Sequence, residues 1–146
     1  MDYDRKESAA YLANLLAKGA SRALQARADG AGFAPGQFPV LLELWSGDGL
    51  TQRELLDRLD IEQATMANTL SRMERDGLIS RRRHPTDKRA QLVYLTLRGK
   101  ALQETALAAA SATEDALFHG FRRFERELLL EYMRMLLANL GRDPRV

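Results

Sequence analysis

The segment 51–96 constrains the fold most, because it combines two short helical patterns with a strand pattern and a strongly basic turn. Thr51 and Glu54 have the spacing of a capping box, which predicts a helix that starts there and continues to a tight corner at residues 59–61. Beyond this corner, apolar residues recur at helical spacing up to Gly77. Two short helices across such a corner resemble a helix-turn-helix.

The next part of this segment predicts a β-hairpin. Residues 78–83 and 91–96 are short β-leaning runs joined by a turn at 85–89. Positive charge is concentrated around this turn, whereas the whole chain has a formal net charge of only +2. The cations are Arg81, Arg82, Arg83, Lys88 and Arg89, and the one anion among them is Asp87. This local excess indicates a polyanionic partner such as nucleic acid.

The outer parts of the chain have helical patterns. Apolar residues at three- and four-residue steps predict a long helix over 5–28, ended by two closely spaced glycines, and a second helix over 35–45. The helical pattern returns at 97–119, breaks near 120–123 and ends in a last, apolar-rich helix. We therefore expect a mainly α fold with a small β-hairpin, organised as a single domain over 1–146.

Composition excludes several classes of protein. A chain of 146 residues with 45% hydrophobic residues suits one domain, although elongated helical chains of this size often complete their core by dimerising. The absence of Cys excludes disulfides, zinc-thiolate sites and thiol redox switches. No apolar run approaches the roughly 18 residues of a membrane span, and the N-terminus lacks a signal-peptide pattern. We expect a cytoplasmic protein without a membrane partner.

The second helix of the helix-turn-helix has a polar face. If Met66, Leu70 and Met73 are buried, small and polar residues point outward. These are Ala64, Thr65, Asn68, Ser71, Arg72 and Arg75, with Gln63 in the first turn. Asn68 suits an adenine edge and Arg72 a guanine or a phosphate. A solvated helix face would give the same pattern, but the adjacent basic hairpin favours DNA.

The hairpin turn suits the DNA backbone and the minor groove. Arg89 at its tip has the length and permanent charge to enter a narrow minor groove. Asp87 either pairs with Arg89 or Lys88 and fixes the tip, or initiates the turn, and both interpretations can hold together. His84 is expected to add a further contact. The predicted phosphate contacts are Gln52, Arg53, Arg81, Arg83 and Lys88.

No enzymatic or metal site is supported. Gly99 and Lys100 do not complete a phosphate loop, because Ala101 stands where Ser or Thr is needed. His84 and His119 are the only histidines, and no ligand set is spaced around them. No Ser has a convincing catalytic partner. We therefore expect no enzyme activity, no cofactor and no metal.

Several runs together resemble the MarR family of bacterial transcription regulators. They are Leu50-Thr51-Gln52-Arg53-Glu54-Leu55, the helix from Ala64 to Arg75, Asp76-Gly77-Leu78-Ile79-Ser80-Arg81, the Asp-x-Arg signature at 87–89, and Leu95-Thr96 with Gly99. The match covers about 50–102, whereas the outer helices match only in pattern. The resemblance implies a winged helix-turn-helix over 34–98 and an obligate homodimer formed by dimerisation helices at 5–28 and 99–141.

The resemblance also implies the partners. It predicts pseudo-palindromic double-stranded DNA with half-sites about one turn apart, and binding relieved by a small phenolic or anionic effector. The effector pocket would lie between the DNA-binding lobe and the dimerisation helices. Its expected walls are Tyr11, Leu15, Phe38, Leu42 and Trp45, although aromatic residues at helical spacing also fit plain core.

Two residues depart from the family pattern. Asp60 replaces the customary Gly of the corner and is expected to tolerate a left-handed backbone. Glu62 replaces the usual Ser or Thr at the start of the second helix. An anion there opposes phosphates unless it accepts from a cytosine amine or neutralises Arg53. Glu62 therefore supports an alternative, in which the same surface binds a protein partner without sequence-specific DNA binding.

Overall fold

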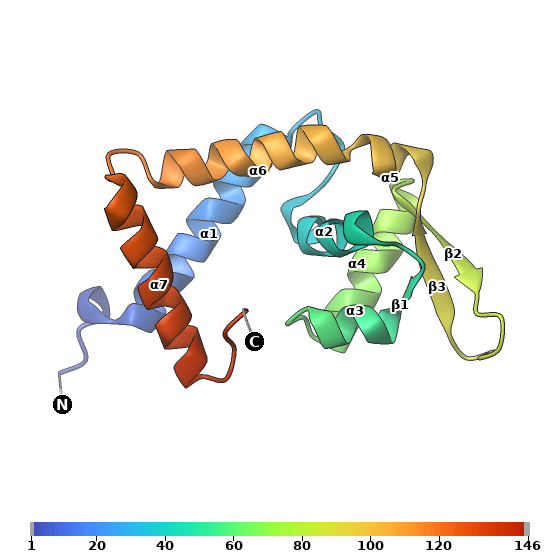
Figure 1. The fold of residues 1–146 in the computed structure, drawn as a ribbon, viewed down its shortest axis with the longest axis horizontal. Helices are drawn as coiled ribbons and strands as arrows, with labels where there is room; N and C mark the ends of the chain where they lie inside the picture. Colours follow the sequence, from blue (N-terminus) through green and yellow to red (C-terminus); the bar gives the residue numbers. More distant parts are fainter. Residues whose placement is uncertain (1, 145–146) are drawn as a thin grey trace. The chain divides into compact units, whose positions relative to one another are not determined.

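The structure, a computed structural model, describes residues 2–144 and is mainly helical with one small antiparallel sheet (Figure 1), as predicted. The chain divides into two compact units, and the boundary between them falls after Thr113. The elements are η1 (Arg5–Glu7), α1 (Ala9–Ala28), η2 (Pro35–Gln37), α2 (Phe38–Ser46), β1 (Leu50–Thr51), α3 (Gln52–Arg58), α4 (Gln63–Arg75), β2 (Ile79–Arg83), β3 (Gln91–Leu95), α5 (Leu97–Ala101), α6 (Gln103–Leu117) and α7 (Arg123–Asn139).

The first helix begins later than predicted. Ser8 separates the short η1 from α1, and its Oγ accepts a hydrogen bond from the N–H of Tyr11 at 3.2 Å. A serine cap of this kind starts a helix, which explains why the helical pattern from residue 5 onward is not continuous. At the other end, Gly30 and Gly32 have φ values of +83° and +96°. These left-handed conformations favour glycine, so the glycine pair ends the helical path as predicted.

The helix predicted over 97–119 is interrupted once. A turn at Leu102 separates α5 from α6, although Leu102 keeps right-handed helical angles of φ −72° and ψ −22°. The interruption is therefore confined to one residue, which is too short to disturb the apolar pattern. The predicted break near 120–123 is confirmed, because Gly120 has a φ of +85° and α7 begins at Arg123.

The core of the first unit lies between α2, α3, α4 and the hairpin (Figure 1). The side chains that build it are at most 2% exposed, and burying each contributes about 1.5–3 kcal/mol. They are Val40, Leu41, Leu44, Leu55, Met66, Leu70, Met73, Leu78, Ile79 and Val93. Because α4 supplies three of these residues, this core fixes which face of α4 remains outside.

The sheet contains one strand more than the predicted hairpin. β2 pairs with β3 antiparallel, from Ile79 opposite Leu95 to Arg83 opposite Gln91. β1 adds to the other side of β3, with Leu50 opposite Val93. A two-residue strand is too short to give a sequence pattern, so only the long-range pairing identifies it. The sheet thereby joins the start of α3 to the base of the hairpin.

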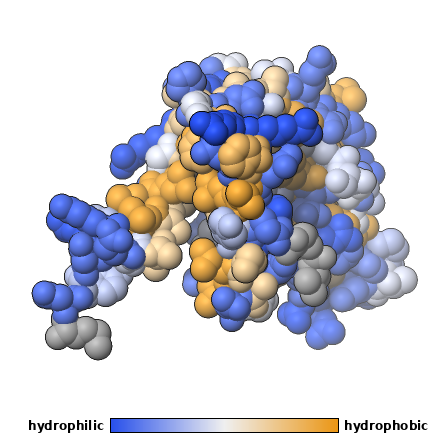
Figure 2. Space-filling view, turned by 60° about the vertical axis from the view of Figure 1, so that its left-hand side comes forward, coloured by the Kyte–Doolittle hydropathy of each residue, from blue (hydrophilic) through white to orange (hydrophobic). Residues whose placement is uncertain are grey.

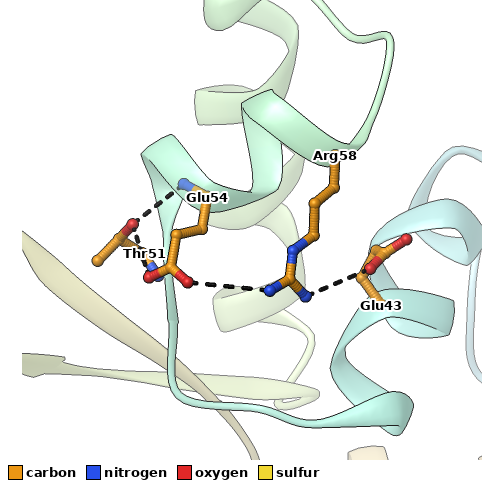
Figure 3. A network of polar contacts seen from close by, with 4 residues as sticks. All are labelled: Glu43, Thr51, Glu54 and Arg58. Atoms are coloured by element: carbon orange, nitrogen blue, oxygen red, sulfur yellow. Dashed lines mark hydrogen bonds and ion pairs between the residues drawn. The ribbon is translucent and has the colours of Figure 1, made fainter. Parts of the chain in front are cut away.

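The predicted capping box at the start of α3 is confirmed and belongs to a larger network (Figure 3). Thr51 Oγ1 accepts from the N–H of Glu54 at 3.1 Å, and Glu54 Oε1 accepts from the N–H of Thr51 at 3.2 Å. Arg58 then bridges Glu54 and Glu43, with N–O distances of 4.0 and 3.6 Å. Because these ions are partly exposed, the bridge adds little stability, but it orients α3 against α2.

Gly99 in α5 packs closely against the neighbouring backbone. A Cβ at this position would lie 2.2 Å from the backbone oxygen of Leu78, so no other residue fits without movement. The carbonyl of Gly99 accepts a hydrogen bond from Trp45 Nε1 at 3.0 Å. Thr96 Oγ1 accepts from the N–H of Gly99 at 3.1 Å and donates to the carbonyl of Gly77 at 2.6 Å. α5 is therefore anchored to α2, to the end of α4 and to the hairpin.

The outer helices expose apolar side chains (Figure 2). In the first unit, α1 exposes Leu12, Leu15 and Leu16. The second unit exposes Phe121, Phe124, Leu128, Tyr132, Met133, Met135, Leu136 and Leu140. A monomer of this kind would leave large apolar area in water, which is typical of an interaction surface. Within residues 2–144, no helix is both long and apolar enough to cross a membrane.

Candidate nucleic-acid interface

The outward face of α4 is placed as predicted. Met66, Leu70 and Met73 are fully buried, so the rest of the helix is turned toward solvent. The exposed residues are Gln63, Ala64, Thr65, Asn68, Ser71, Arg72, Glu74 and Arg75, of which only Glu74 was not among the residues predicted to point outward. They form a polar face with short side chains at its start, which allows a DNA base edge to come close to the backbone.

Arg81 holds this face to the hairpin, a role that the sequence did not indicate. Its Nη2 donates to Ser71 Oγ at 3.1 Å, and its Nε lies 3.8 Å from Glu74 Oε2. The Arg81 side chain is 20% exposed. The structure thus places the guanidinium against α4, which fixes the angle between α4 and β2.

The wing, defined as residues 84–90, is closed by two side-chain caps. His84 Nδ1 accepts from the N–H of Asp87 at 3.0 Å and from the N–H of Thr86 at 3.2 Å. Asp87 Oδ1 accepts from the N–H of Arg89 at 3.0 Å and lies 3.8 Å from Arg89 Nε. The two interpretations of Asp87 therefore both hold: its carboxylate shapes the turn and pairs with Arg89.

The basic residues of the hairpin and its wing are not equivalent. The Arg89 side chain is 96% exposed, and Lys88 and Arg83 are also exposed. Arg82, in contrast, places its guanidinium 4.5 Å from the ring centroid of Tyr94, so it packs on the sheet as a cation–π contact. Arg82 is exposed as well, so the contact with Tyr94, and not burial, distinguishes it from Arg83, Lys88 and Arg89.

A cavity of about 590 Å³ lies where α3, α4 and the wing converge. Seven predicted site residues line it: Gln52, Arg53, Gln63, Arg81, Asp87, Lys88 and Arg89. Ala64, Thr65, Asn68 and Arg72 lie instead along the exposed face of α4, and Arg83 lies on β2. The cavity concentrates positive charge next to the start of α4, where the helix dipole also favours an anion.

The structure places both departures from the family pattern. Within the described residues, no residue other than glycine has a positive φ, so Asp60 turns the corner without the expected left-handed conformation. Glu62 is the N-cap residue of α4, and its carbonyl accepts from the N–H of Met66 at 2.9 Å. Arg53, one of the two partners considered for Glu62, forms an ion pair with Asp57, with an Nε–Oδ1 distance of 3.5 Å.

The predicted effector-pocket residues are dispersed over several environments. Phe38 and Trp45 contact each other edge to face, with ring centroids 6.1 Å apart. Leu15 and Leu42 are exposed, and the ring of Tyr11 lies 5.9 Å from the Arg5 guanidinium. Phe38 and Trp45 pack against the lobe core, so the plain-core interpretation describes these two in the monomer. An effector site at these five positions stays a prediction.

A second cavity, of about 440 Å³, was missed from the sequence. Its walls are Ala28, Asp29, Gly30, Gly32, Phe33, Ala34, Arg75, Asp76 and Arg98. The buried Gln37 donates to Asp76 Oδ2 at 3.0 Å. This hydrogen bond, followed by the charges of Arg75 and Arg98, lowers the pKa of Asp76. The sequence signal for this cavity was Gln37, a polar residue in the first turn of the predicted second helix.

Comparisons with known proteins agree on one family. The model of the MarR family matches residues 33–90. The HTH-type transcriptional repressor YetL of Bacillus subtilis is 30% identical over 114 residues, which cover 77% of this chain and 68% of YetL.

The chain is a member of the MarR family.

Solved MarR-family structures share the fold over almost the whole chain. A MarR transcriptional regulator from Methanosarcina mazei is 29% identical, with a TM-score of 0.77 over 88% of this chain and 93% of that chain. BpsR of Bordetella bronchiseptica, whose DNA binding is regulated by 6-hydroxynicotinic acid, has a TM-score of 0.82 at 24% identity, over 93% and 97% of the two chains. The protein is thus a winged-helix, DNA-binding transcriptional regulator of the MarR family.

Proposed function

We propose that this regulator is a homodimeric repressor that binds a pseudo-palindromic operator through α4 and the wing of each subunit. The observation that carries the proposal is the cavity at which α3, α4 and the wing converge, because Arg53, Lys88 and Arg89 share it with the start of α4. A helix with a small polar outward face beside such a basic edge is suited to the major groove.

Each part of this surface has a separate role in the proposal. Asn68 and Arg72 contact base edges in the major groove, with Gln63, Ala64 and Thr65 next to them. Arg89 enters the minor groove, where narrow A·T-rich DNA concentrates negative potential. Backbone phosphates are held by Gln52, Arg53, Arg83 and Lys88, whereas Arg81 supports α4 through Ser71.

Binding to labelled duplex DNA, measured as a function of salt, tests the proposal. Affinity should fall steeply with added salt, because phosphate contacts release counterions. Lys88→Ala should reduce the salt slope by about one unit, whereas Asn68→Ala should relax base preference at one symmetric pair of positions in DNA selected from a random library. Identical selected motifs for the wild type and the Asn68 variant would remove Asn68 from the recognition surface.

The same salt titration distinguishes the repressor from the alternative function, a protein-interaction module. Glu62 favours it, since an anion at the N-cap of α4 is repelled by phosphates. Salt-insensitive affinity for duplex DNA, together with selected sequences that show no motif, would support the alternative and overturn the repressor. Glu62→Ser should then leave DNA affinity unchanged, whereas in a repressor it should raise that affinity.

We propose repression by occlusion, which a reporter gene under the selected operator tests. Deleting the regulator should raise expression. A fall in expression would show activation instead.

We also propose release by a small phenolic or anionic effector, as 6-hydroxynicotinic acid regulates DNA binding of BpsR. The chain contains one Trp, Trp45, so its fluorescence reports directly on the predicted pocket. Adding an aromatic hydroxy acid should release DNA and change this emission, and Trp45→Phe identifies the source of the signal. Release from DNA without any change of emission would place the effector site elsewhere.

A further inference from the structure

His84 makes contacts within the wing that determine which of its ring nitrogens accepts hydrogen bonds. The N–H groups of Thr86 and Asp87 lie 3.2 and 3.0 Å from Nδ1, and Thr86 Oγ1 lies 3.3 Å from it. A backbone N–H can only donate, so Nδ1 must be the acceptor and must carry a lone pair. A neutral imidazole of this kind holds its proton on Nε2.

The ring of His84 is the first link in a short chain of contacts that ends at Arg89. Nδ1 holds the N–H of Asp87, and the carboxylate of Asp87 in turn holds the N–H of Arg89 at 3.0 Å. The base of the turn is closed by backbone hydrogen bonds from His84 N–H to the Ala90 carbonyl at 3.2 Å and from Ala90 N–H to the Asp87 carbonyl at 3.1 Å. Without the ring, the first half of the turn keeps no side-chain cap of its own.

We propose that His84 is a positioning residue that caps the wing as the Nε2–H tautomer and, through Asp87, directs Arg89 toward DNA. The role in DNA binding rests on the proposed function, whereas the cap itself belongs to the free protein. The competing interpretation is a direct contact from Nε2–H to a phosphate. The two differ in which ring nitrogen matters.

Two substitutions separate the ring nitrogens. In His84→Asn, Oδ1 is attached to Cγ as Nδ1 is, so it can accept from the same backbone N–H groups, as Asn does in Asx turns. In His84→Gln, the amide group lies one bond further out, near the position of Nε2, so it can reach outward but does not replace the cap. His84→Ala removes both functions, and His119→Asn, at an exposed histidine of the second unit, is the control.

Measurements on the free protein test the cap. Nitrogen-15 spectra of the imidazole should show the proton on Nε2 and a lone pair on Nδ1. Amide hydrogen exchange at Thr86 and Asp87 should accelerate about threefold to tenfold in the Ala and Gln variants and should remain near wild type in the Asn variant. A proton on Nδ1, or equal exchange rates in all four proteins, would overturn the cap.

DNA titrations test the positioning role. Operator affinity should fall about threefold to tenfold in His84→Ala and His84→Gln, and His84→Asn should restore it. In an Arg89→Ala background, His84→Ala should have no further effect, because His84 acts through Arg89. Additive losses, or rescue by Gln in place of Asn, would show a direct phosphate contact and overturn the positioning role.

The failure of this inference and the failure of the proposed function give different results. If wild-type protein shows no salt-dependent duplex binding, the repressor proposal fails, while the tautomer and exchange data still decide on the cap. If wild type binds and the cap data fail, only the role of His84 is withdrawn.

Discussion

Arg89 extends from the wing almost fully exposed, while its backbone N–H and its Nε are both held by Asp87. A long side chain whose base is fixed loses less freedom on binding than a free one, so its contact with a groove is more favourable. In the proposed complex with DNA, Asp87 would thus favour binding through Arg89, although its own charge is repelled by phosphate.

Replacing Arg89 with Ala should lower specific operator affinity by about 1–3 kcal/mol, because one groove contact is lost. The measurement is an operator titration at fixed salt, with sedimentation to verify that the oligomeric state is unchanged. Arg123→Ala is the matched control, since it removes an equally exposed arginine from the second unit. Equal losses in the two variants would mean that only net charge matters at position 89.

We expect Asp76 to make the stability of the first unit depend on pH. Its folded pKa is lowered, so its charge stabilises the fold above the ordinary aspartate range of about 4, and this stabilisation is lost as the pH falls through the folded value. Asp76→Asn, which can keep the bond from Gln37, should therefore be less stable than wild type at neutral pH and equally stable in strong acid. Urea unfolding at a series of pH values measures the difference. A difference that is constant with pH would contradict the prediction.

At the scale of single residues, helical periodicity was sufficient to predict the outward face of α4 from Met66, Leu70 and Met73. The roles of His84 and Arg81 could not be predicted in the same way. The cap of His84 depends on backbone N–H directions inside a turn, and Arg81 meets Ser71 only after the hairpin has packed against α4. Residue types at a given spacing do not specify either geometry.

At the scale of elements, α5 packs at Gly99 against Leu78, the residue before β2, without room for a side chain. Gly99→Ala would place a Cβ against the Leu78 carbonyl, so α5 must move and strain the bond from Trp45. We expect a loss of about 3 kcal/mol in the free energy of unfolding, measured by urea at fixed protein concentration.

Gly19→Ala is the control for this substitution. Gly19 lies in the middle of α1 with no heavy atom within 4 Å of its ideal Cβ, so alanine should stabilise the helix by about 0.5–1 kcal/mol. If both variants lost stability equally, the close approach at Gly99 would not be the cause.

Element types were predictable where patterns were long, and boundaries were missed where one residue decides them. The capping box at Thr51 and the break at Gly120 were predicted because a residue type at a fixed position is sufficient for each. The late start of α1 depends on Ser8, and β1 depends on pairing with β3 about forty residues further along the chain. Long-range pairing has no local pattern, so the third strand was missed.

At the scale of the whole molecule, the exposed apolar residues of α7 suit the proposed second copy. Leu136→Glu should shift the protein toward monomers, because an anion would replace a leucine in the interface, and light scattering after size exclusion measures the shift. Ala138→Glu is the control, since residue 138 lies about 200° around the helix from residue 136. A Leu136 variant that remains dimeric would exclude this face of α7 from the interface.

The close packing at Gly99 determines which elements can move together. The carbonyl of Gly99 accepts a hydrogen bond from Trp45 of α2, and its N–H donates to Thr96, which in turn donates to the carbonyls of Gly77 and Leu78. α5 is therefore held against α2, the end of α4 and the start of the hairpin at one residue. In the proposed dimer, a rotation of α5 would therefore turn α4 and the wing together and change their distance from the α4 and wing of the second subunit.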